Sequence, residues 1–386
     1  MIEANKRQDA QRCIAYIDCA SWFGGAQRSL WTLMNGVRQH GIVPLLFSAD
    51  RTRGGLLDLC RTAGIDCFPV TVHHWHTSCR GLLQFLHDRT RFINHSWNSL
   101  ARQQGIPPVA MLHANSTRAA LLCSSLASAE RPLIVHARDV REPGIVRRLV
   151  RRQAGRIIAV SETVARLWEK NDGAEKIRIV HNGFDTNAIS DVTPQPVPWH
   201  DEPDAFTVIM VADFVAWKRH ELFLKTVAAA RRWIPSLHAL LVGRTLDTQG
   251  EKRLRYLQKK AAGLGLDEHA LSIVTNAPNA LPWIAASDVL VSTADREPFG
   301  RTVVEALACG KPVVTVKGGG PEEILKNCAA GCVVTDEPEI LARAVAEFCD
   351  RLSLAEIAET ARTCARNFSE ERMITGILKA YSEVVP

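Results

Sequence analysis

Residues 288–324 read DVLVSTADREPFGRTVVEALACGKPVVTVKGGGPEEI, and this stretch predicts a strand, a loop and a helix in immediate succession. The run at 288–293 is apolar, rich in β-branched residues and short, as buried strands are. Apolar residues then recur at helical spacing over 302–309, and Gly310 and Pro312 end that pattern. Such a unit presents backbone N–H groups and the positive end of a helix dipole to a phosphate. The stretch therefore predicts an α/β architecture with a phosphate site at the start of the helix.

Two glutamates flank the start of this helix. Glu297 lies in the loop, where its carboxylate can accept hydrogen bonds from sugar hydroxyls. Glu305 follows inside the helix, where a carboxylate can hold a vicinal diol such as a ribose. Either glutamate alone would be interpreted as a solvated surface charge, but here every part of the run agrees with a phosphate site. The combination predicts a nucleotide-sugar site, whose donor-binding residues include Glu297, Phe299, Gly300, Arg301, Thr302 and Glu305.

This block resembles the E-x7-E signature of the retaining glycosyltransferases of family 4 (GT4, group 1 glycosyl transferases), which have the GT-B fold. The resemblance covers nearly the whole chain. It extends to residues 22–30, which resemble the family's Gly-Gly-Ala-Glu-Arg loop with Gln27 in place of the usual glutamate. Further motifs follow in the family's order at 113–116, 136–139, 160–162 and 180–185. It implies two Rossmann-like, doubly wound domains facing across a cleft. It also implies a hexosyltransferase that moves a sugar from a UDP- or GDP-linked donor, with retention of configuration, to a hydroxyl of a glycan, lipid-linked or small-molecule acceptor.

The order of predicted elements agrees with two α/β domains. Strand-like runs alternate with helical stretches, which indicates parallel sheets. They lie at 13–19, 42–48, 109–113, 133–136 and 156–160, and again at 206–212, 238–242, 271–274, 288–292, 312–316 and 332–335. A proline-rich stretch separates the two series and has a linker composition. We therefore expect an acceptor-side domain at 1–193, a linker at 194–204, a nucleotide-sugar domain at 205–367 and a helix at 368–386 that crosses back to the first domain.

In the second domain the resemblance implies that basic residues of the loop after the first strand reach the donor diphosphate. Lys218 matches the family's lysine, whereas Asp213 stands near the position where the family usually has an arginine. We expect the neighbouring Arg219 to supply the missing charge. Gly243 and Asn276 follow two further strands and are expected to border the nucleobase.

In the first domain the candidate residues follow predicted strands. Gly24, Gly25 and Arg28 open a helix and predict a loop that approaches a phosphate or the acceptor. His136 matches a family histidine that faces the transferred sugar, so His136 and Glu297 are the candidate catalytic residues. A lone histidine is more often structural, and the family match favours function here. The acceptor-side set is completed by His113, Asn115, Arg138 and Asp139.

No metal or other cofactor is expected beyond the nucleotide-sugar co-substrate. The chain has no Asp-x-Asp triplet, the motif with which metal-dependent transferases hold a cation on the diphosphate. The helix start and Lys218 are therefore expected to neutralise the leaving group. The cluster at 73–76 has three histidines without partnering carboxylates or cysteines in sequence, so we interpret it as an acceptor-side loop rather than a zinc site.

Charge is concentrated in the first half of the chain. Residues 1–195 hold 25 Lys and Arg against 16 Asp and Glu, a net charge of +9, and the remainder holds 22 against 25, which together give the overall +6. Much of the excess lies within Arg141–Arg156, and it predicts either a solvated basic face or peripheral contact with anionic lipid headgroups. Nucleic-acid binding is not expected, because no aromatic residues interleave with these arginines.

Other features of the composition indicate a cytoplasmic protein. There is no run of 18 apolar residues and no signal-peptide pattern at the start. The 11 cysteines form no CxxC pair and predict buried thiols rather than a disulfide framework.

Two alternatives remain open at this level. A GT-B nucleotide-sugar epimerase or a phosphorylase would have a similar donor site but a different reaction. A pseudoenzyme would bind a nucleotide sugar without turnover, and Asp213 in place of the usual arginine is the observation that prompts it.

Overall fold

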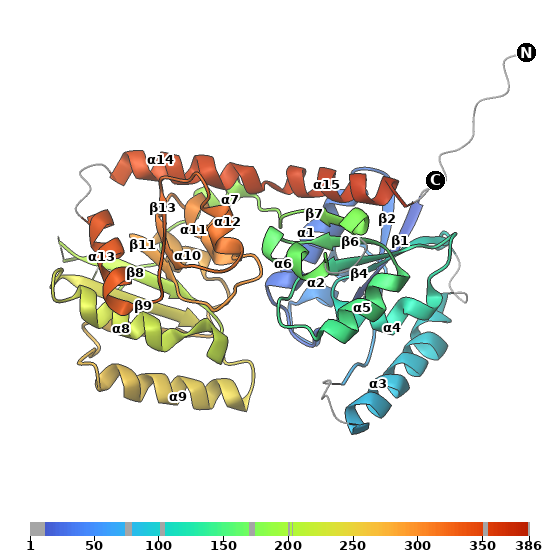
Figure 1. Cartoon of the computed structure of the whole chain (residues 1–386), viewed down its shortest axis with the longest axis horizontal. Helices are drawn as coiled ribbons and strands as arrows, with labels where there is room; N and C mark the ends of the chain where they lie inside the picture. The colour runs from blue at the N-terminus through green and yellow to red at the C-terminus, as the bar shows by residue number, and fades with distance from the viewer. Residues whose placement is uncertain are drawn as a thin grey trace, which may run out of the picture. The chain divides into compact units, whose positions relative to one another are not determined.

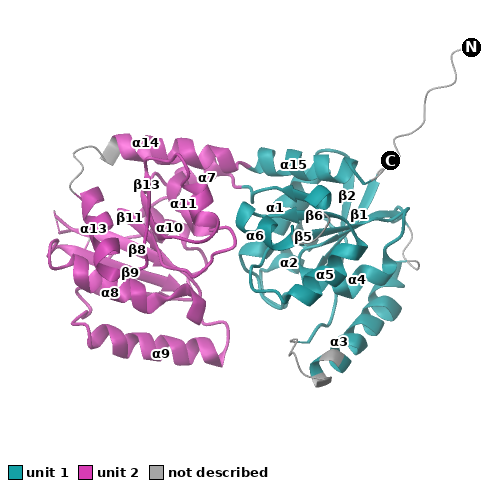
Figure 2. Cartoon of the chain, viewed as in Figure 1, with its two compact units in different colours: residues 1–183, 370–386 teal, residues 184–369 magenta. Residues whose placement is uncertain are grey.

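The computed structural model describes residues 12–73, 79–100, 105–169, 174–199, 201–202, 204–349 and 354–384. The chain forms two compact units, shown in Figures 1 and 2. Unit 1 comprises residues 1–183 and 370–386, and unit 2 comprises residues 184–369. Each unit contains one parallel sheet with helices between its strands, so the predicted α/β class with two Rossmann-like domains is confirmed.

Unit 1 is built on a seven-stranded parallel sheet of order β3-β2-β1-β4-β5-β6-β7. Its strands are β1 Arg12–Asp18, β2 Ile42–Ser48, β3 Cys67–Pro69, β4 Val109–Ala114, β5 Leu133–Ala137, β6 Ala154–Ala159 and β7 Ile177–Ile179. Its helices are α1 Gly25–Arg38, α2 Leu56–Thr62, α3 Cys79–Arg91, α4 Thr117–Cys123, α5 Gly144–Gln153, α6 Glu162–Trp168 and α15 Glu370–Ser382. The sequence did not predict β3 and β7, because three-residue strands are too short to show a periodicity.

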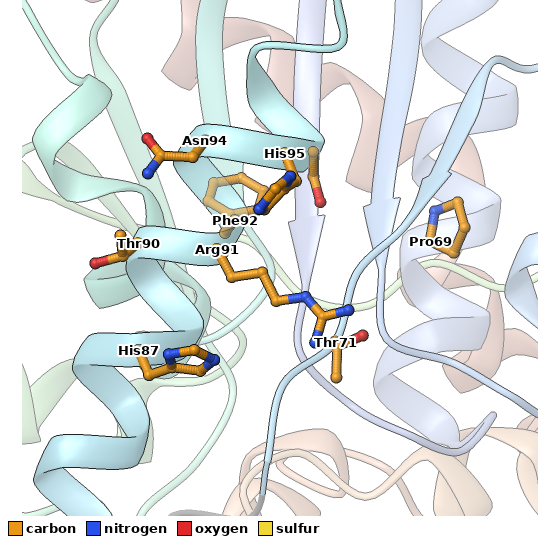
Figure 3. A pocket seen from close by; sticks show the side chains of 9 residues that line it. Pro69, Thr71, His87, Thr90, Arg91, Phe92, Asn94 and His95 are labelled. Atoms are coloured by element: carbon orange, nitrogen blue, oxygen red, sulfur yellow. The ribbon is translucent and has the colours of Figure 1, made fainter.

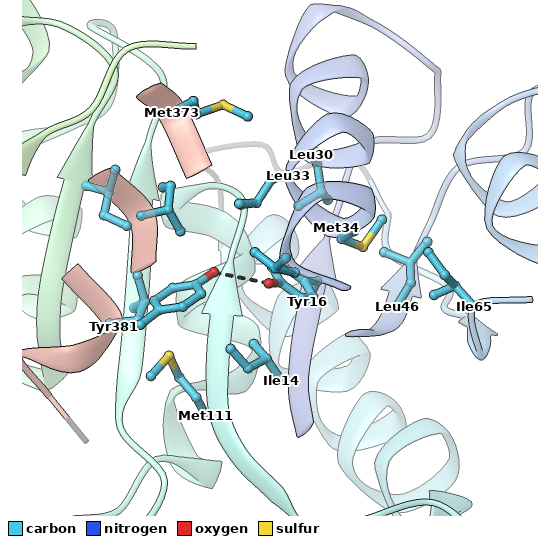
Figure 4. Close-up of a cluster of buried hydrophobic side chains, with 14 of the residues drawn as sticks. Ile14, Tyr16, Leu30, Leu33, Met34, Leu46, Ile65, Met111, Met373 and Tyr381 are labelled. Atoms are coloured by element: carbon cyan, nitrogen blue, oxygen red, sulfur yellow. Dashed lines mark hydrogen bonds between the residues drawn. The ribbon is translucent and has the colours of Figure 1, made fainter. Parts of the chain in front are cut away.

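The core of unit 1 joins α1, the sheet and the C-terminal helix α15 (Figure 4). Leu30 and Leu33 of α1 pack in one buried cluster with Ile377 and Tyr381 of α15. The two helices approach closely at Gly36, where an added Cβ would lie 2.0 Å from the Ile374 side chain. The last helix of the chain is therefore part of the first unit.

Unit 2 is built on a six-stranded parallel sheet of order β10-β9-β8-β11-β12-β13. Its strands are β8 Phe206–Val211, β9 Leu237–Gly243, β10 Leu271–Thr275, β11 Val289–Ser292, β12 Val313–Val316 and β13 Gly331–Val334. Its helices are α7 Thr186–Ser190, α8 His220–Ala230, α9 Thr248–Ala262, α10 Leu281–Ala285, α11 Arg301–Ala308, α12 Gly320–Ile324, α13 Pro338–Cys349 and α14 Leu354–Ala365. The strand order reverses between β8 and β11, the place where ligands bind in open sheets of this kind.

The segment expected to be a linker differs in the structure. Residues 184–204 belong to unit 2, so the first unit ends before the expected residue 193. The Gln195 N–H donates to the Pro282 carbonyl over 2.9 Å. Trp199 is 3% exposed, and its Nε1 donates to Thr207 Oγ1 over 2.8 Å. Pro194, Pro196 and Pro198 lie in a stretch without helix or strand, and they do not prevent that stretch from packing on the unit that follows.

One pair of cysteines also differs from the prediction of free thiols. Cys328 and Cys364 form a disulfide that joins the segment before β13 to α14, whereas thiols were expected throughout. Eight other cysteines in the described part of the chain are free, and most of them are buried, including Cys13, Cys60 and Cys309. Among the described helices, none is both long enough and apolar enough to cross a membrane.

Candidate functional site

The loop between β11 and α11 is held by close backbone contact with the loop before α12. The Gly320 N–H donates to the Glu297 carbonyl over 2.8 Å. An added Cβ at Gly319 would lie 2.5 Å from the Glu297 carbonyl oxygen, and one at Gly320 would lie 2.3 Å from the Phe299 carbonyl oxygen. These two glycines therefore allow the approach that fixes the position of Glu297.

Lys218 and Glu297 form an ion pair in unit 2. Lys218 Nζ lies 2.5 Å from Glu297 Oε2, and the two side chains are 18% and 15% exposed. Lys218 Nζ also lies 4.1 Å from the centroid of the Trp217 ring. The buried Thr293 donates from Oγ1 to the Lys218 carbonyl over 2.9 Å, so the end of β11 positions the lysine loop. Sequence reasoning missed Thr293, because its partner is distant in the chain.

The second glutamate lies inside α11, one turn after the start of the helix. Glu305 Oε1 lies 3.3 Å from an Nη of Arg301 one turn earlier. The Arg301 guanidinium stacks over the Phe184 ring at 4.4 Å. Phe299 is 3% exposed and packs between Phe184 and Phe368, with ring centroids 6.2 and 5.9 Å away. Phe299 therefore anchors the loop between β11 and α11 in the core of unit 2.

The chain enters α11 through a glycine in the left-handed backbone region. Gly300, at the N-cap, has a φ of +102°, a conformation that favours glycine. Thr302, in the first turn, is half-buried. Both remain candidate donor-binding residues.

Asp213, which stands near the expected position of an arginine, is paired with Arg244 in unit 2. Arg244 Nε lies 2.8 Å from Asp213 Oδ1, and an Nη of Arg244 lies 3.0 Å from Oδ2. Hydrogen bonding to Asp213 raises the pKa of Arg244. Arg219 is paired instead with the exposed Asp336 over 2.8 Å. The structure therefore brings a bidentate arginine to the Asp213 loop that sequence reasoning did not assign.

Asn276 and Gly243 lie at adjacent strand ends. The Asn276 N–H donates to the Gly243 carbonyl over 2.8 Å, and Asn276 Oδ1 accepts from the Thr245 N–H over 3.1 Å. An added Cβ at Gly243 would lie 2.2 Å from the Ala212 carbonyl oxygen. The glycine thus lets β9 end directly beside the loop that carries Lys218.

In unit 1 the glycine loop is organised by the buried Asp18. Gln27 Nε2 and Asn115 Nδ2 both donate to Asp18 Oδ1 over 2.9 Å, and the Gly24 N–H donates to Gln27 Oε1 over 3.1 Å. Burial raises the pKa of Asp18, and the two amide donors oppose that rise. A glutamate at position 27 would place a second carboxylate beside Asp18, which explains the amide there. Gly25 begins α1, and the Arg28 guanidinium lies 5.4 Å from the Phe23 ring.

A buried chain of hydrogen bonds runs from α15 to His136. The Tyr381 hydroxyl lies 3.2 Å from the Tyr16 hydroxyl and 2.7 Å from His113 Nδ1. The hydrogen bond between the two tyrosines is the dashed line in Figure 4. His113 Nε2 lies 3.2 Å from His136 Nδ1. Arg138 approaches the same His136 Nδ1 at 3.2 Å. The chain thus connects the end of α15 with the ends of β4 and β5.

The donors in this chain determine the tautomer of His136. An arginine only donates, so His136 Nδ1 accepts and the proton of the neutral ring is on Nε2. Burial, and next Arg138, lower the pKa of His113 to about 3, and the same causes lower the pKa of His136 well below its usual value. Both rings are therefore neutral at pH 7. His136 Nε2 is buried and has no hydrogen-bond partner in the described part of the chain, so it is available to donate to a ligand.

The remaining acceptor-side residues divide into two groups. Arg138 donates from Nε to Asn115 Oδ1 over 2.8 Å and from an Nη to Asn182 Oδ1 over 2.7 Å. These contacts bring Arg138 and Asn115 into the same network as His136. Asp139 is exposed and accepts from the Arg141 N–H over 2.9 Å, so it lies outside that network.

Sequence reasoning also missed Glu142. Its carboxylate accepts a hydrogen bond from Thr117 at the start of α4. Burial raises the pKa of Glu142 to about 7, and the negative charge of the neighbouring Asp139 contributes to that rise. No local sequence pattern signals this group, since its burial depends on packing against α4.

We expect Glu142→Gln to reduce the pH dependence of stability. A carboxyl whose pKa is higher in the folded than in the unfolded state binds its proton more tightly when folded. In the unsubstituted protein, the free energy of unfolding should therefore fall as the pH rises from about 4.5, the ordinary pKa of a glutamate, to about 7. A glutamine side chain does not titrate, so the Glu142→Gln variant should lack this fall. That difference corresponds to roughly 3 kcal/mol. Urea unfolding between pH 5 and pH 8 measures it, with the exposed Glu130→Gln as control, and equal pH slopes in both variants would contradict it.

The residues described by the structure hold no group of three or more His, Cys, Asp or Glu side chains placed to bind a metal ion. His73 Nδ1 lies 2.8 Å from Asp88 Oδ1. The other histidines of the 73–76 cluster lie outside the described residues.

Comparison with known proteins gives two family models that together match most of the chain. The model described as Glycosyl transferases group 1 matches residues 196–363, and the one described as Glycosyltransferase Family 4 matches residues 23–188. The D-inositol 3-phosphate glycosyltransferase of Salinispora arenicola is 27% identical, over 76% of this chain and 68% of its own. The enzyme of that name from Paenarthrobacter aurescens is 27% identical, over 82% of this chain and 79% of its own.

Solved structures share the fold. Anabaena HepE, crystallised with UDP and glucose, superposes with a TM-score of 0.76 at 21% identity and covers 96% of this chain and 99% of its own. Sucrose-phosphate synthase from Thermosynechococcus elongatus superposes with a TM-score of 0.75 at 18% identity, covering 97% and 99%. At these identities the likeness establishes the fold alone.

Proposed function

This chain belongs to the group 1 glycosyl transferases of family 4, and on that premise we propose that it transfers a hexosyl group from a UDP- or GDP-sugar to a hydroxyl acceptor with retention of configuration. The observation that carries the proposal is the Lys218–Glu297 pair, which is fixed next to the start of α11 by Gly319, Gly320 and Thr293. It places a cation and a carboxylate where a helix start presents backbone N–H groups.

The roles of the side chains follow from their chemistry. Lys218 and the start of α11 stabilise the departing diphosphate, which takes the proton of the attacking acceptor hydroxyl on the same face of the sugar. Glu297 accepts hydrogen bonds from the hydroxyls of the transferred sugar, and Glu305 accepts from the ribose. His136 donates from Nε2 to the transferred sugar. Positioning and electrostatic stabilisation supply the rate enhancement, and no enzymatic nucleophile is required.

The function is tested by incubating the purified protein with UDP- and GDP-sugars and candidate acceptors, and by reading the anomeric configuration of the product by NMR. Retained configuration with release of nucleoside diphosphate is the expected result. Conversion of the donor without any acceptor would establish an epimerase instead. Nucleotide binding without turnover on any acceptor would establish the pseudoenzyme that Asp213 prompts.

Transfer should continue in excess EDTA. Lys218 and the start of α11 supply the positive charge that a cation provides in metal-dependent transferases. The rate before and after chelation, and after addition of Mn²⁺, is the measurement. Activity that is abolished by EDTA and restored by Mn²⁺ would refute the metal-independent mechanism.

We further propose that α5 makes peripheral contact with an anionic membrane. Its residues 145, 148, 149 and 152 recur at helical spacing and are exposed, with Ile145 and Leu149 at 72% and 49%. They combine two apolar side chains with Arg148 and Arg152 on one face, while Val146 and Val150 are buried. A face of this kind is attracted by anionic headgroups and buries its apolar side chains among them.

Binding to anionic vesicles should therefore weaken as salt rises and should fall in an Ile145→Ser/Leu149→Ser variant. Sedimentation with phosphatidylserine and phosphatidylcholine vesicles measures both effects. Arg53→Ser, an exposed residue outside α5, is the control. Equal sedimentation with the two lipids would show that charge does not drive the contact.

A further inference from the structure

A cavity of about 590 Å³ opens in unit 1 beside β3, and the residues that line it are not among the candidate site residues described above (Figure 3). Pro69 and Thr71, at and after the end of β3, form one wall. Residues 87–96, from the end of α3 and the turn that follows, contribute the other. Cavities of this size accommodate small-molecule ligands.

The wall formed by residues 87–96 is anchored in the core. Residues Phe92–Trp97 form a π-helical turn, an uncommon conformation that often occurs at functional sites. Phe92 is 2% exposed and meets the Phe47 ring edge-on at 5.5 Å. Trp97 lies 5.7 Å from the same ring. These contacts fix the turn on β2, so the polar side chains beside it are presented from a packed element.

Basic residues recur along this wall. His87, Arg91 and His95 are spaced by four, which places them on one side of a helix. Figure 3 shows Arg91 extending toward Thr71 across the cavity. Arg91 makes no hydrogen bond or ion pair with any residue that the structure describes, so its guanidinium is available to a ligand.

No acidic residue is among the described residues that line the cavity. The neighbouring acid, Asp88, is 1% exposed and turned toward His73, whose N–H and ring Nδ1 both lie 2.8 Å from its oxygens. The hydroxyls of Thr71 and Thr90 and the amide of Asn94 add hydrogen-bonding groups. The cavity therefore combines an uncompensated positive charge with donors and acceptors for hydroxyl groups.

We propose that this cavity binds a phosphate monoester carried on a small polyol, such as a sugar phosphate. The planar fork of Arg91 matches phosphate oxygens, and the threonine hydroxyls and Asn94 match polyol hydroxyls. Binding of this ligand in unit 1 does not depend on the proposed transfer reaction.

Glucose 6-phosphate, titrated calorimetrically into the full chain with UDP present to occupy any donor site, tests the proposal. It should bind at least about tenfold more tightly than glucose, because only the phosphate forms charge-assisted hydrogen bonds. Arg91→Gln should weaken its binding by about tenfold or more. Arg89→Gln, which removes the same charge from α3 outside the cavity lining, should stay within about twofold.

The two arginine variants distinguish a phosphate site at Arg91 from a general attraction between opposite charges. Unchanged affinity in Arg91→Gln, or an equal loss in Arg89→Gln, would overturn the proposal. Vesicles of phosphatidylcholine with phosphatidic acid carry the same phosphate monoester on a lipid, and Arg91-dependent binding to vesicles alone would assign the ligand to a membrane. Binding to neither probe would refute the site, even if transfer is observed. Arg91-dependent binding without any transfer would refute only the proposed function.

Discussion

Lys218→Ala should lower kcat/KM for sugar transfer by about 10²–10³-fold, the cost of removing one preorganised group that stabilises charge in a transition state. Lys218 is held over Trp217 and against Glu297, so its ammonium is positioned before the donor arrives. The substitution removes a cation and also leaves Glu297, which is 15% exposed, without this partner. Lys218→Arg should recover part of the rate, since the charge is kept in a different geometry.

Initial rates over a range of donor concentrations measure this effect. Lys225→Ala, on the exposed side of α8, removes the same charge outside the loop and is the matched control. Thermal unfolding of each variant separates lost catalysis from lost folding. A kcat/KM within about twofold of the unsubstituted protein in a folded Lys218→Ala variant would remove the lysine from the proposed mechanism.

Arg219→Ala should cost less than Lys218→Ala. The sequence suggested that Arg219 replaces the family's arginine, but its guanidinium pairs with the exposed Asp336, and it would have to leave that pair to reach a phosphate. Exposed ion pairs of this kind contribute little free energy, so Arg219 could leave Asp336 at small cost when a donor binds. The same assay therefore compares Arg219→Ala with Arg244→Ala, in which the bidentate partner of Asp213 is lost.

His136→Ala should lower kcat/KM by about 10²-fold, the lower end of the cost of losing a hydrogen-bond donor aimed at a transition state. The effect should come from Nε2–H of a neutral ring, because the pKa of His136 lies well below its usual value. The pH profile above pH 6 should accordingly show no step from His136 or from His113, whose pKa is about 3.

Tyr381→Phe tests how that donor is positioned. The Tyr381 hydroxyl, 2.7 Å from His113 Nδ1, directs the His113 Nε2–H toward His136 Nδ1 and so supports the Nε2 proton of His136. We expect kcat to fall by about fivefold to tenfold, since buried chains of hydrogen bonds support one another. The ¹⁵N spectrum of the histidine rings should show a weaker preference for the Nε2–H tautomer. A merely structural role would change stability but leave the ring spectrum unaltered.

Tyr16→Phe is the matched control for this chain. It also removes a phenolic hydroxyl, but the Tyr16 hydroxyl is one hydrogen bond further from His136 and bonds to the Tyr381 hydroxyl. We expect a smaller change in both kcat and the ring spectrum. Equal effects of the two substitutions would show that kcat depends on burying a hydroxyl group at either position, and not on the order of the hydrogen bonds that lead to His136.

Much of the fold was predictable because its signals are local. Each of the six strands of unit 2 is a short apolar run, and periodicity within one window is enough to detect it. The start of α11 was predictable for the same reason, since Gly300 and the apolar residues after it are adjacent in the chain. The linker predicted at 194–204 was wrong, because a proline-rich composition indicates the local conformation of a segment and not where that segment packs. Trp199 places that segment in unit 2.

The sequence by itself determined that Lys218 and Glu297 are candidates, because each follows a strand of a predicted parallel sheet, where ligand-binding residues gather. Only the tertiary structure decided that they pair with each other, 79 residues apart, and that Asp213 pairs with Arg244 while Arg219 pairs with Asp336. It also decided that Tyr381 reaches His113 across 268 residues. Such contacts depend on which strand ends become neighbours and on the side chains buried between them. Those are properties of the assembled sheet and helices, and no single window of sequence contains them.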